Sequence, residues 1–200
     1  MSDPIRTERR MTVEEFLAWD DGTGISYELI DGIPEPKYVE FVNGRPVAQA
    51  APAVEHSAIV SNIGGALGRR LRAPCRSFTE VGVAASRREN TYFQADVAVS
   101  CVEGRIAGSV LPHPVFIVEV LSPGTAGRDE GAKLTDYCAN PSVQAVLLVE
   151  TREPLARLIR RVGDHWEIEF LRGIDAVAVL PFLDLELPLA EVYRDIAFEG

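Results

Sequence analysis

The sequence predicts an α/β protein built around a mixed β-sheet. The run Gln144–Val149 is apolar throughout, which is typical of a strand buried on both faces of a sheet, and a helical pattern over about Asp129–Cys138 precedes it. A strand reached through a helical crossover runs parallel to the strand before it. In contrast, Asn43-Gly44 between Tyr38–Val42 and Arg45–Ala48 predicts an antiparallel hairpin. The sheet should therefore contain both kinds of strand pair.

Helix caps and apolar spacing define the other elements. Thr12 and Glu15 have the spacing of a capping box, so a short helix is expected over about Val13–Trp19. The longest helix is expected over Val54–Leu71, because apolar residues recur there at helical spacing. Strands are expected over Ser26–Gly32, Arg76–Thr79, Val81–Ala85, Asp96–Cys101, Val115–Leu121, Ala156–Val162 and Trp166–Leu171, and a helical turn over Pro188–Tyr193.

The composition indicates one soluble globular domain over residues 1–200, in which residues 1–10 are expected to be flexible. A chain of 200 residues with 46% hydrophobic and 25% charged residues can bury one core. No segment approaches the roughly 20 apolar residues that span a bilayer, so we expect no membrane association. The net charge of −10 argues against a protein that coats nucleic acid nonspecifically, but not against a nuclease that gathers carboxylates around a metal.

The cysteines suggest a reducing environment. Cys75, Cys101 and Cys138 are odd in number and have no Cys-x-x-Cys spacing, which argues against a disulfide framework and a structural zinc site. Each lies beside apolar or small residues, so we expect packed thiols rather than a catalytic one. The cytoplasm is the simplest location for such a chain.

Two consecutive apolar strands each carry one carboxylate. Asp96 lies in Gln94–Val99 and Glu119 lies in Phe116–Leu121. A charge within an apolar run is unfavourable unless it has a partner or binds a metal. Carboxylate oxygens are the ligands of hard cations, so the pair predicts a Mg²⁺ site, with Mn²⁺ as an alternative ion. The alternative is that each acid has no functional role and lies at a strand end, where it is exposed or hydrogen-bonded.

A lysine follows these strands on the next predicted helix. A lysine beside a metal site can orient or deprotonate the attacking water, and Lys133 is the candidate. Asp129 at i−4 and Tyr137 at i+4 share its helical face. Taken alone, a lysine at position 133 is most often a solvated helix residue paired with Asp129.

The motifs of this chain also match those of a known family. They are Met11–Leu17, Glu40–Gly44, Glu55–Ser57, Asp96, Glu119–Pro123, Asp129-x-x-x-Lys133 and Tyr137. In this order they resemble the Uma-two family of restriction-endonuclease-like proteins, within the PD-(D/E)XK nuclease superfamily. The resemblance implies a restriction-endonuclease-like core, a central mixed sheet flanked by helices, and Mg²⁺-dependent cleavage of DNA. It also implies a homodimer, since nucleases with this fold that cut both strands commonly pair.

The resemblance assigns roles to individual residues. Asp96 and Glu119 are the two motif acids and the metal ligands. The superfamily usually places its lysine two residues after the second acid, where this chain has Leu121, and Ala95 replaces the usual proline. The resemblance therefore gives the role of that lysine to Lys133.

The upstream acid is less well defined by the sequence. The resemblance assigns it to Glu40 and places His56 in the same cleft. Glu28 fits the same local pattern, although the spacing to His56 favours Glu40. A group of arginines would form either a DNA-facing strip or a solubilising surface: Arg69, Arg70, Arg72, Arg76, Arg87 and Arg88.

Two hypotheses of function follow. The first is a Mg²⁺-dependent DNA endonuclease that uses Glu40, Asp96, Glu119 and Lys133, supported by His56, Tyr137 and Asp129. The second is a catalytically inert nuclease-fold module used for protein association or regulation, which Leu121 and the sequence pI of 4.8 favour. The geometry of the acids and of the lysine separates the two.

Overall fold

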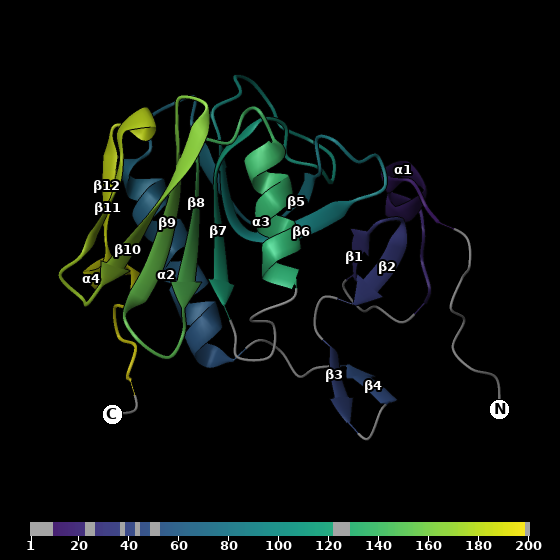
Figure 1. Cartoon of the computed structure of the whole chain (residues 1–200), viewed down its shortest axis with the longest axis horizontal. Coiled ribbons are helices and arrows are strands. Elements are labelled where there is room, and N and C mark those ends of the chain that lie inside the picture. Colours follow the sequence, from purple (N-terminus) through teal and green to yellow (C-terminus); the bar gives the residue numbers. More distant parts are fainter. Residues whose placement is uncertain are drawn as a thin grey trace.

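The computed structural model describes residues 10–22, 27–36, 39–42, 45–48, 53–121 and 129–198, without the side chains of 39–42, 45–48, 129, 130 and 132. The elements, shown in Figure 1, are α1 (Val13–Leu17), β1 (Tyr27–Ile30), β2 (Ile33–Pro36), β3 (Val39–Val42), β4 (Arg45–Ala48), α2 (Val54–Arg70), β5 (Arg76–Ala84), β6 (Tyr92–Ser100), β7 (Pro114–Leu121), α3 (Asp129–Ala139), β8 (Ala145–Glu150), β9 (Leu155–Val162), β10 (His165–Arg172), β11 (Val177–Leu180), a 3-10 turn (Pro181–Leu183), β12 (Leu185–Pro188) and α4 (Leu189–Val192).

The central sheet is mixed, as the sequence predicts. Its strand order is β10-β9-β8-β7-β6-β1-β2, and β5 pairs with β6 as the eighth strand. The pair β7–β8 is parallel and is joined through α3, whereas the other described neighbours in this sheet are antiparallel. The predicted hairpin β3–β4 forms a separate sheet, and its Asn43-Gly44 turn lies outside the described residues.

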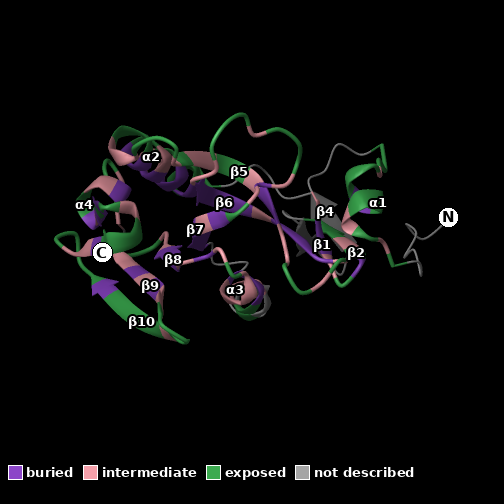
Figure 2. Ribbon diagram, turned by 90° about the horizontal axis from the view of Figure 1, so that it is seen from above, coloured by how far each residue is buried: buried purple, intermediate pink, exposed green. Residues whose placement is uncertain are grey.

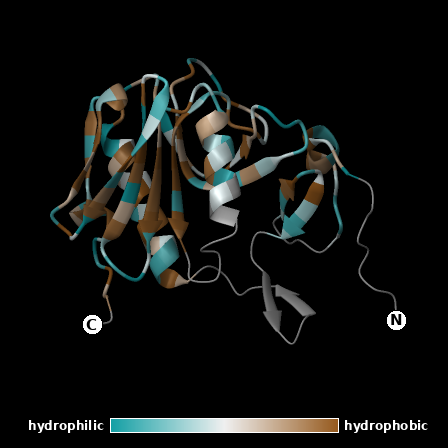
Figure 3. Cartoon of the chain, viewed as in Figure 1, coloured by the Kyte–Doolittle hydropathy of each residue, from teal (hydrophilic) through white to brown (hydrophobic). Residues whose placement is uncertain are grey.

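Helices cover both faces of the sheet. Figure 2 shows α2 and α3 on opposite sides of it, with the buried strands β6 to β8 between them. Ile63 of α2 belongs to the same core cluster as Val118 and Leu147, and Tyr137 of α3 joins Ile117 in the other. The strands between the helices are accordingly the most hydrophobic part of the chain in Figure 3. Within the described residues, no helix has the length and apolar content needed to cross a bilayer.

A small apolar cluster attaches the β1–β2 hairpin to the edge of β6. The predicted capping box of Thr12 forms and starts α1, so that Phe16 reaches Tyr92 with ring centroids 5.4 Å apart. Leu29 of β1 is fully buried in this cluster and lies opposite Tyr92 in the ladder. At the hairpin turn Gly32 has φ +82°, and an added Cβ would lie 2.8 Å from Cβ of Arg10, so the turn requires glycine.

The structure corrects several boundaries. Residues Arg76–Ala84 form one strand instead of two, because the ladder with β6 continues in the same register on both sides of Glu80, although Glu80 itself has φ +49°. The first helix ends at Leu17. Strands β2, β11 and β12 are not apparent in the sequence pattern, since they are short and each carries proline or exposed residues.

The cysteine argument against a disulfide was wrong. Cys75 and Cys101 are disulfide-bonded, with their Cα atoms 3.8 Å apart. Arg76 and Ser100 are partners in the β5–β6 ladder, so the residues one position beyond them face each other. The spacing of cysteines along the chain does not report this pairing. Cys138 is free and partly buried, and burial raises the pKa of its thiol.

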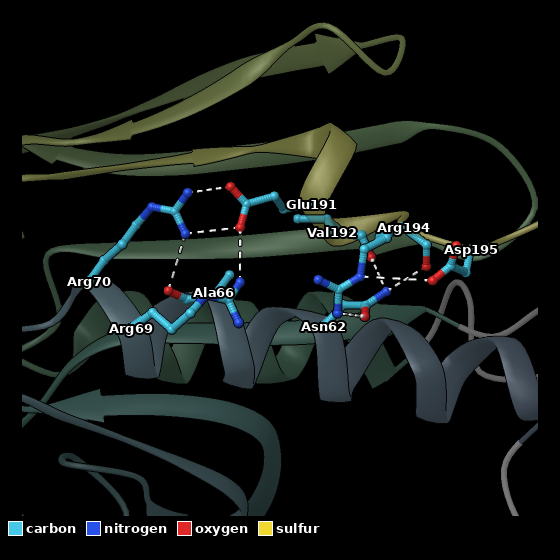
Figure 4. A network of polar contacts seen from close by, with 8 residues as sticks. All are labelled: Asn62, Ala66, Arg69, Arg70, Glu191, Val192, Arg194 and Asp195. Atoms are coloured by element: carbon cyan, nitrogen blue, oxygen red, sulfur yellow. Dashed lines mark hydrogen bonds and ion pairs between the residues drawn. The ribbon is translucent and has the colours of Figure 1, made fainter.

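Charged and polar contacts hold the C-terminal segment against α2 (Figure 4). Glu191 of α4 accepts hydrogen bonds from Arg69 at 3.1 Å and from Arg70, which uses both terminal nitrogens. The side-chain amide of Asn62 donates to two backbone carbonyl groups of residues 192–194, at 3.2 and 2.9 Å. A bidentate arginine pair of this kind exceeds an ordinary surface pair in strength.

Replacing Glu191 by glutamine should lower the free energy of unfolding by about 1 kcal/mol at pH 7, measured by urea denaturation. The hydrogen bond from Arg70 lowers the pKa of Glu191, so this contribution is present above the unfolded-state pKa and is lost as the pH falls through the folded-state pKa. Glu169→Gln removes a more exposed pair with Arg160 and is the matched control, with an expected change below about 0.5 kcal/mol. Equal effects of the two variants would contradict the prediction.

Candidate active site

Three acidic side chains and one lysine connect β1, β6, β7 and α3. Glu28, Asp96 and Glu119 are 7%, 3% and 9% exposed, and the side chain of Lys133 is 17% exposed. Buried carboxylates need partners. The contacts of these four residues therefore define the candidate site.

Asp96 and Glu119 face each other across two antiparallel strands. The β6–β7 ladder pairs Val97 with Val118, and the next position in the same register brings Asp96 opposite Glu119. The backbone N–H of Val120 donates to Oδ2 of Asp96 at 2.8 Å. Like charges at facing positions repel, so this arrangement is unfavourable without a compensating positive charge.

His56 reaches the same carboxylate from the first turn of α2. Its Nε2 lies 3.3 Å from Oδ2 of Asp96, and both side chains are buried. The apolar face of α2 packs on the sheet and thereby aims His56 at β6. The structure thus brings together the histidine and the acid that the sequence singled out.

Lys133 and Tyr137, one helical turn apart, contact Glu119. The hydroxyl of Tyr137 donates to Oε1 of Glu119 at 2.6 Å, and Nζ of Lys133 lies 3.9 Å from Oε2. The ring of Tyr137 packs edge-on against the ring of Phe93, with centroids 5.6 Å apart. Nζ of Lys133 lies 5.7 Å from the centre of the Phe93 ring. Phe93 therefore supports both contacts of α3.

Glu28 completes the cluster from the β1 side. Nζ of Lys133 donates to Oε1 of Glu28 at 2.7 Å, and the backbone N–H of Gln94 donates to the same oxygen at 2.9 Å. The side chain of Glu40, the other sequence candidate, lies outside the described residues, and only its backbone pairing with Val47 is described. Glu28 shows the same signal as Asp96, an acid within an apolar strand.

Burial dominates the electrostatics of Glu119. It raises the pKa of this carboxyl to about 7, although Lys133 opposes the shift and Asp96 adds to it. Burial also raises the pKa of Tyr137 well above its usual value, and Glu119 adds to that shift. Tyr137 therefore stays a hydrogen-bond donor, while Glu119 can exchange a proton near neutral pH.

The donor set suits a divalent cation in its chemistry. Glu28, Asp96 and Glu119 bring three buried carboxyl groups together around the ammonium of Lys133. Carboxylates are the usual ligands of Mg²⁺ and Mn²⁺. In the part of the chain that the structure describes, however, no three His, Cys, Asp or Glu side chains lie close enough to hold a metal as they stand. The residues thus fit the ion by charge and type, and a bound ion would require side-chain adjustment.

Within the described contacts, the structure does not place Asp129 or the arginines singled out in the sequence together at this site. Asp129 begins α3, but its side chain lies outside the described residues, as does the loop 122–128. The arginine strip is divided: Arg72 lies near Asp184 at 3.8 Å, and Arg76 donates to the carbonyl of Gly104 at 2.7 Å. Arg88 instead lies between β1–β2 and α3, a placement that the sequence did not indicate.

Comparison with known proteins agrees with this architecture. A crystal structure described as a putative nuclease belonging to DUF820, from Anabaena variabilis ATCC 29413, is similar with a TM-score of 0.63 and 21% identity, over 92% of this chain and 97% of that chain. The uncharacterized protein slr1290 of Synechocystis sp. (strain ATCC 27184 / PCC 6803 / Kazusa) is 25% identical over 193 residues, which cover 94% of each chain. The family model Uma2, described as "Putative restriction endonuclease", matches residues 33–190. The chain therefore belongs to the Uma2 family and has a nuclease-like fold.

Proposed function

We propose that this protein is a Mg²⁺-dependent DNA endonuclease, with Mn²⁺ as an alternative ion. The observation that carries the proposal is the facing pair Asp96 and Glu119, buried on adjacent strands and joined by Lys133 to a third acid, Glu28. Facing like charges destabilise a sheet, so a pair that has no function would be costly to retain. The family description and the nuclease-like fold support the choice of phosphodiester hydrolysis.

Each residue has a distinct task in this proposal. Asp96 and Glu119 would hold the cation, which when bound supplies positive charge at the phosphate and makes a water more acidic. The N–H of Val120 fixes one oxygen of Asp96, and the hydroxyl of Tyr137 fixes one oxygen of Glu119. These contacts orient both carboxylates before a ligand arrives.

Lys133 would position the attacking water and offset charge on the phosphate. Its ammonium hydrogen-bonds to Glu28 and lies within 3.9 Å of Glu119, so it sits at the edge of the proposed metal site. Glu28 thereby takes the place of the upstream acid, acting through Lys133. His56 holds Asp96 from the side of α2.

Cation binding gives the first test of the proposal. Mn²⁺ at millimolar concentration should raise the melting temperature of the wild-type protein at pH 8, because a ligand of the folded state stabilises it. Asp96→Asn should lose this shift and the binding heat in calorimetry. Asp164→Asn, on the exposed β9–β10 turn, is the matched control and should retain both.

DNA cleavage gives the second test. Supercoiled plasmid and linear duplexes incubated with Mg²⁺ or Mn²⁺ should be cut by the wild type and by Asp164→Asn, but not by Asp96→Asn. Intact substrates together with a missing cation site in the wild type would contradict the proposal. Cation binding without cleavage would instead favour the inert module.

The proposal extends to assembly and location. We propose a homodimer, because a double-strand cut needs two such sites; light scattering should then give about twice the chain mass of 21.9 kDa. A monomeric mass at the working concentration would contradict it. DNA as the substrate makes the cytoplasm the proposed site of action.

A further inference from the structure

Arg88 connects the two elements that carry Glu28 and Lys133. It lies in the loop between β5 and β6, and its Nη1 lies 2.7 Å from Oδ1 of Asp31 in the turn between β1 and β2. On its other side it donates to both carboxylate oxygens of Asp136 in α3, through Nε at 3.2 Å and through Nη2. One guanidinium thus bridges two carboxylates from different elements.

The bridge through Arg88 lies close to the hydrogen bond between Glu28 and Lys133 in the candidate site. Glu28 precedes Asp31 by three residues in the hairpin, and Lys133 precedes Asp136 by three residues in α3. The same two elements are therefore tied twice, once by Glu28 and Lys133 and once through Arg88. At about 3.3 Å per strand residue and 1.5 Å per helical residue, the second tie lies within roughly 10 Å of the first.

The loop itself does not depend on the guanidinium. Gly32 N–H donates to the carbonyl of Asn90 at 2.6 Å, and the hydroxyl of Ser86 donates to the carbonyl of Ala139 at 3.2 Å. These contacts hold the loop against the hairpin turn and against the end of α3. The side chain of Arg88 thus adds a tie to a framework that already has backbone contacts.

We propose that Arg88 is a positioning residue, which fixes α3 against the β1–β2 hairpin so that the Lys133 ammonium stays between Glu28 and Glu119. The expected effect of Arg88 on catalysis rests on the proposed function, whereas its effect on the position of α3 and Lys133 does not. Arg88 touches neither the proposed metal ligands nor Lys133 in the described contacts. A planar guanidinium suits this task, since it bonds two carboxylates in a fixed geometry.

The simpler role for Arg88 is to neutralise Asp136, which is 7% exposed. Asp31 distinguishes the two roles, because its side chain is 51% exposed and needs no neutralisation. Asp31→Asn removes the charge that holds Arg88 to the hairpin, and asparagine tolerates the φ of +49° at this position. The contact between Arg88 and Asp136 stays intact in this variant.

Hydrogen–deuterium exchange of the metal-free protein is the first measurement. In Asp31→Asn we expect amides of Tyr27–Ile30 to exchange about tenfold faster or more, while those of β8 and the urea midpoint remain unchanged. Arg88→Met combined with Asp136→Asn, which leaves no unpaired buried charge, should reproduce the faster exchange. Arg160→Met is the matched control, because the Arg160 side chain has a similar exposure and also pairs with a carboxylate, that of Glu169. It should leave Tyr27–Ile30 at the wild-type rate.

The second measurement reports on Lys133 directly. Lysine-selective ¹³C labelling gives two Cε signals, since the chain contains only Lys37 and Lys133. In Asp31→Asn the Lys133 signal should move toward the chemical shift of lysine in an unfolded peptide, and Lys37→Arg identifies which signal belongs to Lys133. If cleavage is observed, kcat should fall about tenfold with KM unchanged, because the tie acts on orientation and not on DNA binding.

The outcomes distinguish the positioning role of Arg88 from the proposed nuclease activity. If the amides of Asp31→Asn exchange at the wild-type rate and the Lys133 signal does not move, the positioning role is overturned and Arg88 is only the counter-ion of Asp136. If exchange is faster and the Lys133 signal moves, the positioning role is supported even if no DNA is cut. In that case the proposed function fails alone.

Discussion

Replacing Glu119 by glutamine should abolish cleavage and, at pH 8, make the protein more stable. Glu119 is buried, and burial raises the pKa of its carboxyl to about 7, so the ionised form that predominates at pH 8 is disfavoured in the folded state. The difference between 4.5 and about 7 corresponds to at most about 3 kcal/mol, and we expect a gain of about 1 to 3 kcal/mol. Glutamine keeps an oxygen that accepts the hydrogen bond of Tyr137.

The pH dependence of this gain has a definite sign. Because the folded-state pKa of Glu119 lies above the unfolded one, the folded state binds the proton more tightly. The wild type therefore loses stability as the pH rises from about 4.5 to about 7, whereas the variant does not. Urea unfolding at pH 4.5, 6 and 8 should show a difference that widens with pH. Glu169→Gln on exposed β10 is the control, and a difference independent of pH would contradict the prediction.

The loss of cleavage should accompany the gain in stability. A neutral amide cannot replace a carboxylate opposite Asp96 as a cation ligand, so we expect at least a hundredfold lower rate, which corresponds to about 3 kcal/mol in the barrier. A residue that stabilises when it is neutralised and is still needed for activity marks a functional site. If Glu119→Gln instead destabilised the protein at pH 8, Glu119 would be a structural ion-pair partner of Lys133.

The acids and the lysine were visible in the sequence because their signals are local. Asp96 and Glu119 interrupt apolar strands, and Lys133 shares a helical face with Tyr137. The strand pairing that could be predicted also depended on a local signal in the sequence. An apolar run after a helical pattern predicts the parallel pair β7–β8, and the structure contains it.

The rest of the site depends on contacts between distant residues. Glu28 reaches Lys133 across 105 positions of the chain because Leu29 pairs with Tyr92 and attaches β1 to β6, and no local pattern in the sequence reports that contact. The pairing of Arg88 with Asp136 spans 48 positions in the same way. Cys75 and Cys101 meet only through the ladder of β5 with β6, which is why counting cysteines gave the wrong expectation.

The choice of lysine at position 133 is itself informative. The chain has 20 Lys and Arg residues, of which only Lys37 and Lys133 are lysines. A guanidinium is always protonated and is broad and planar, whereas an ammonium is compact and can release a proton. A compact donor that lies between Glu28 and Glu119 and can take part in proton transfer has to be lysine. We therefore expect Lys133 to act in turnover more than in folding.

Lys133→Met should lower kcat by about 10² to 10⁴, the range typical of a lost acid–base group, while Mn²⁺ affinity is retained or increased. The affinity should not fall, because the substitution removes a positive charge 3.9 Å from Glu119. Single-turnover cleavage and calorimetry on one preparation measure both quantities. Thr135→Ala, an exposed position on the same helix, is the control. If Lys133 only neutralised the acids, Lys133→Met combined with Glu28→Gln would restore cleavage; if it positions the water, that double variant stays inactive although its charge is balanced.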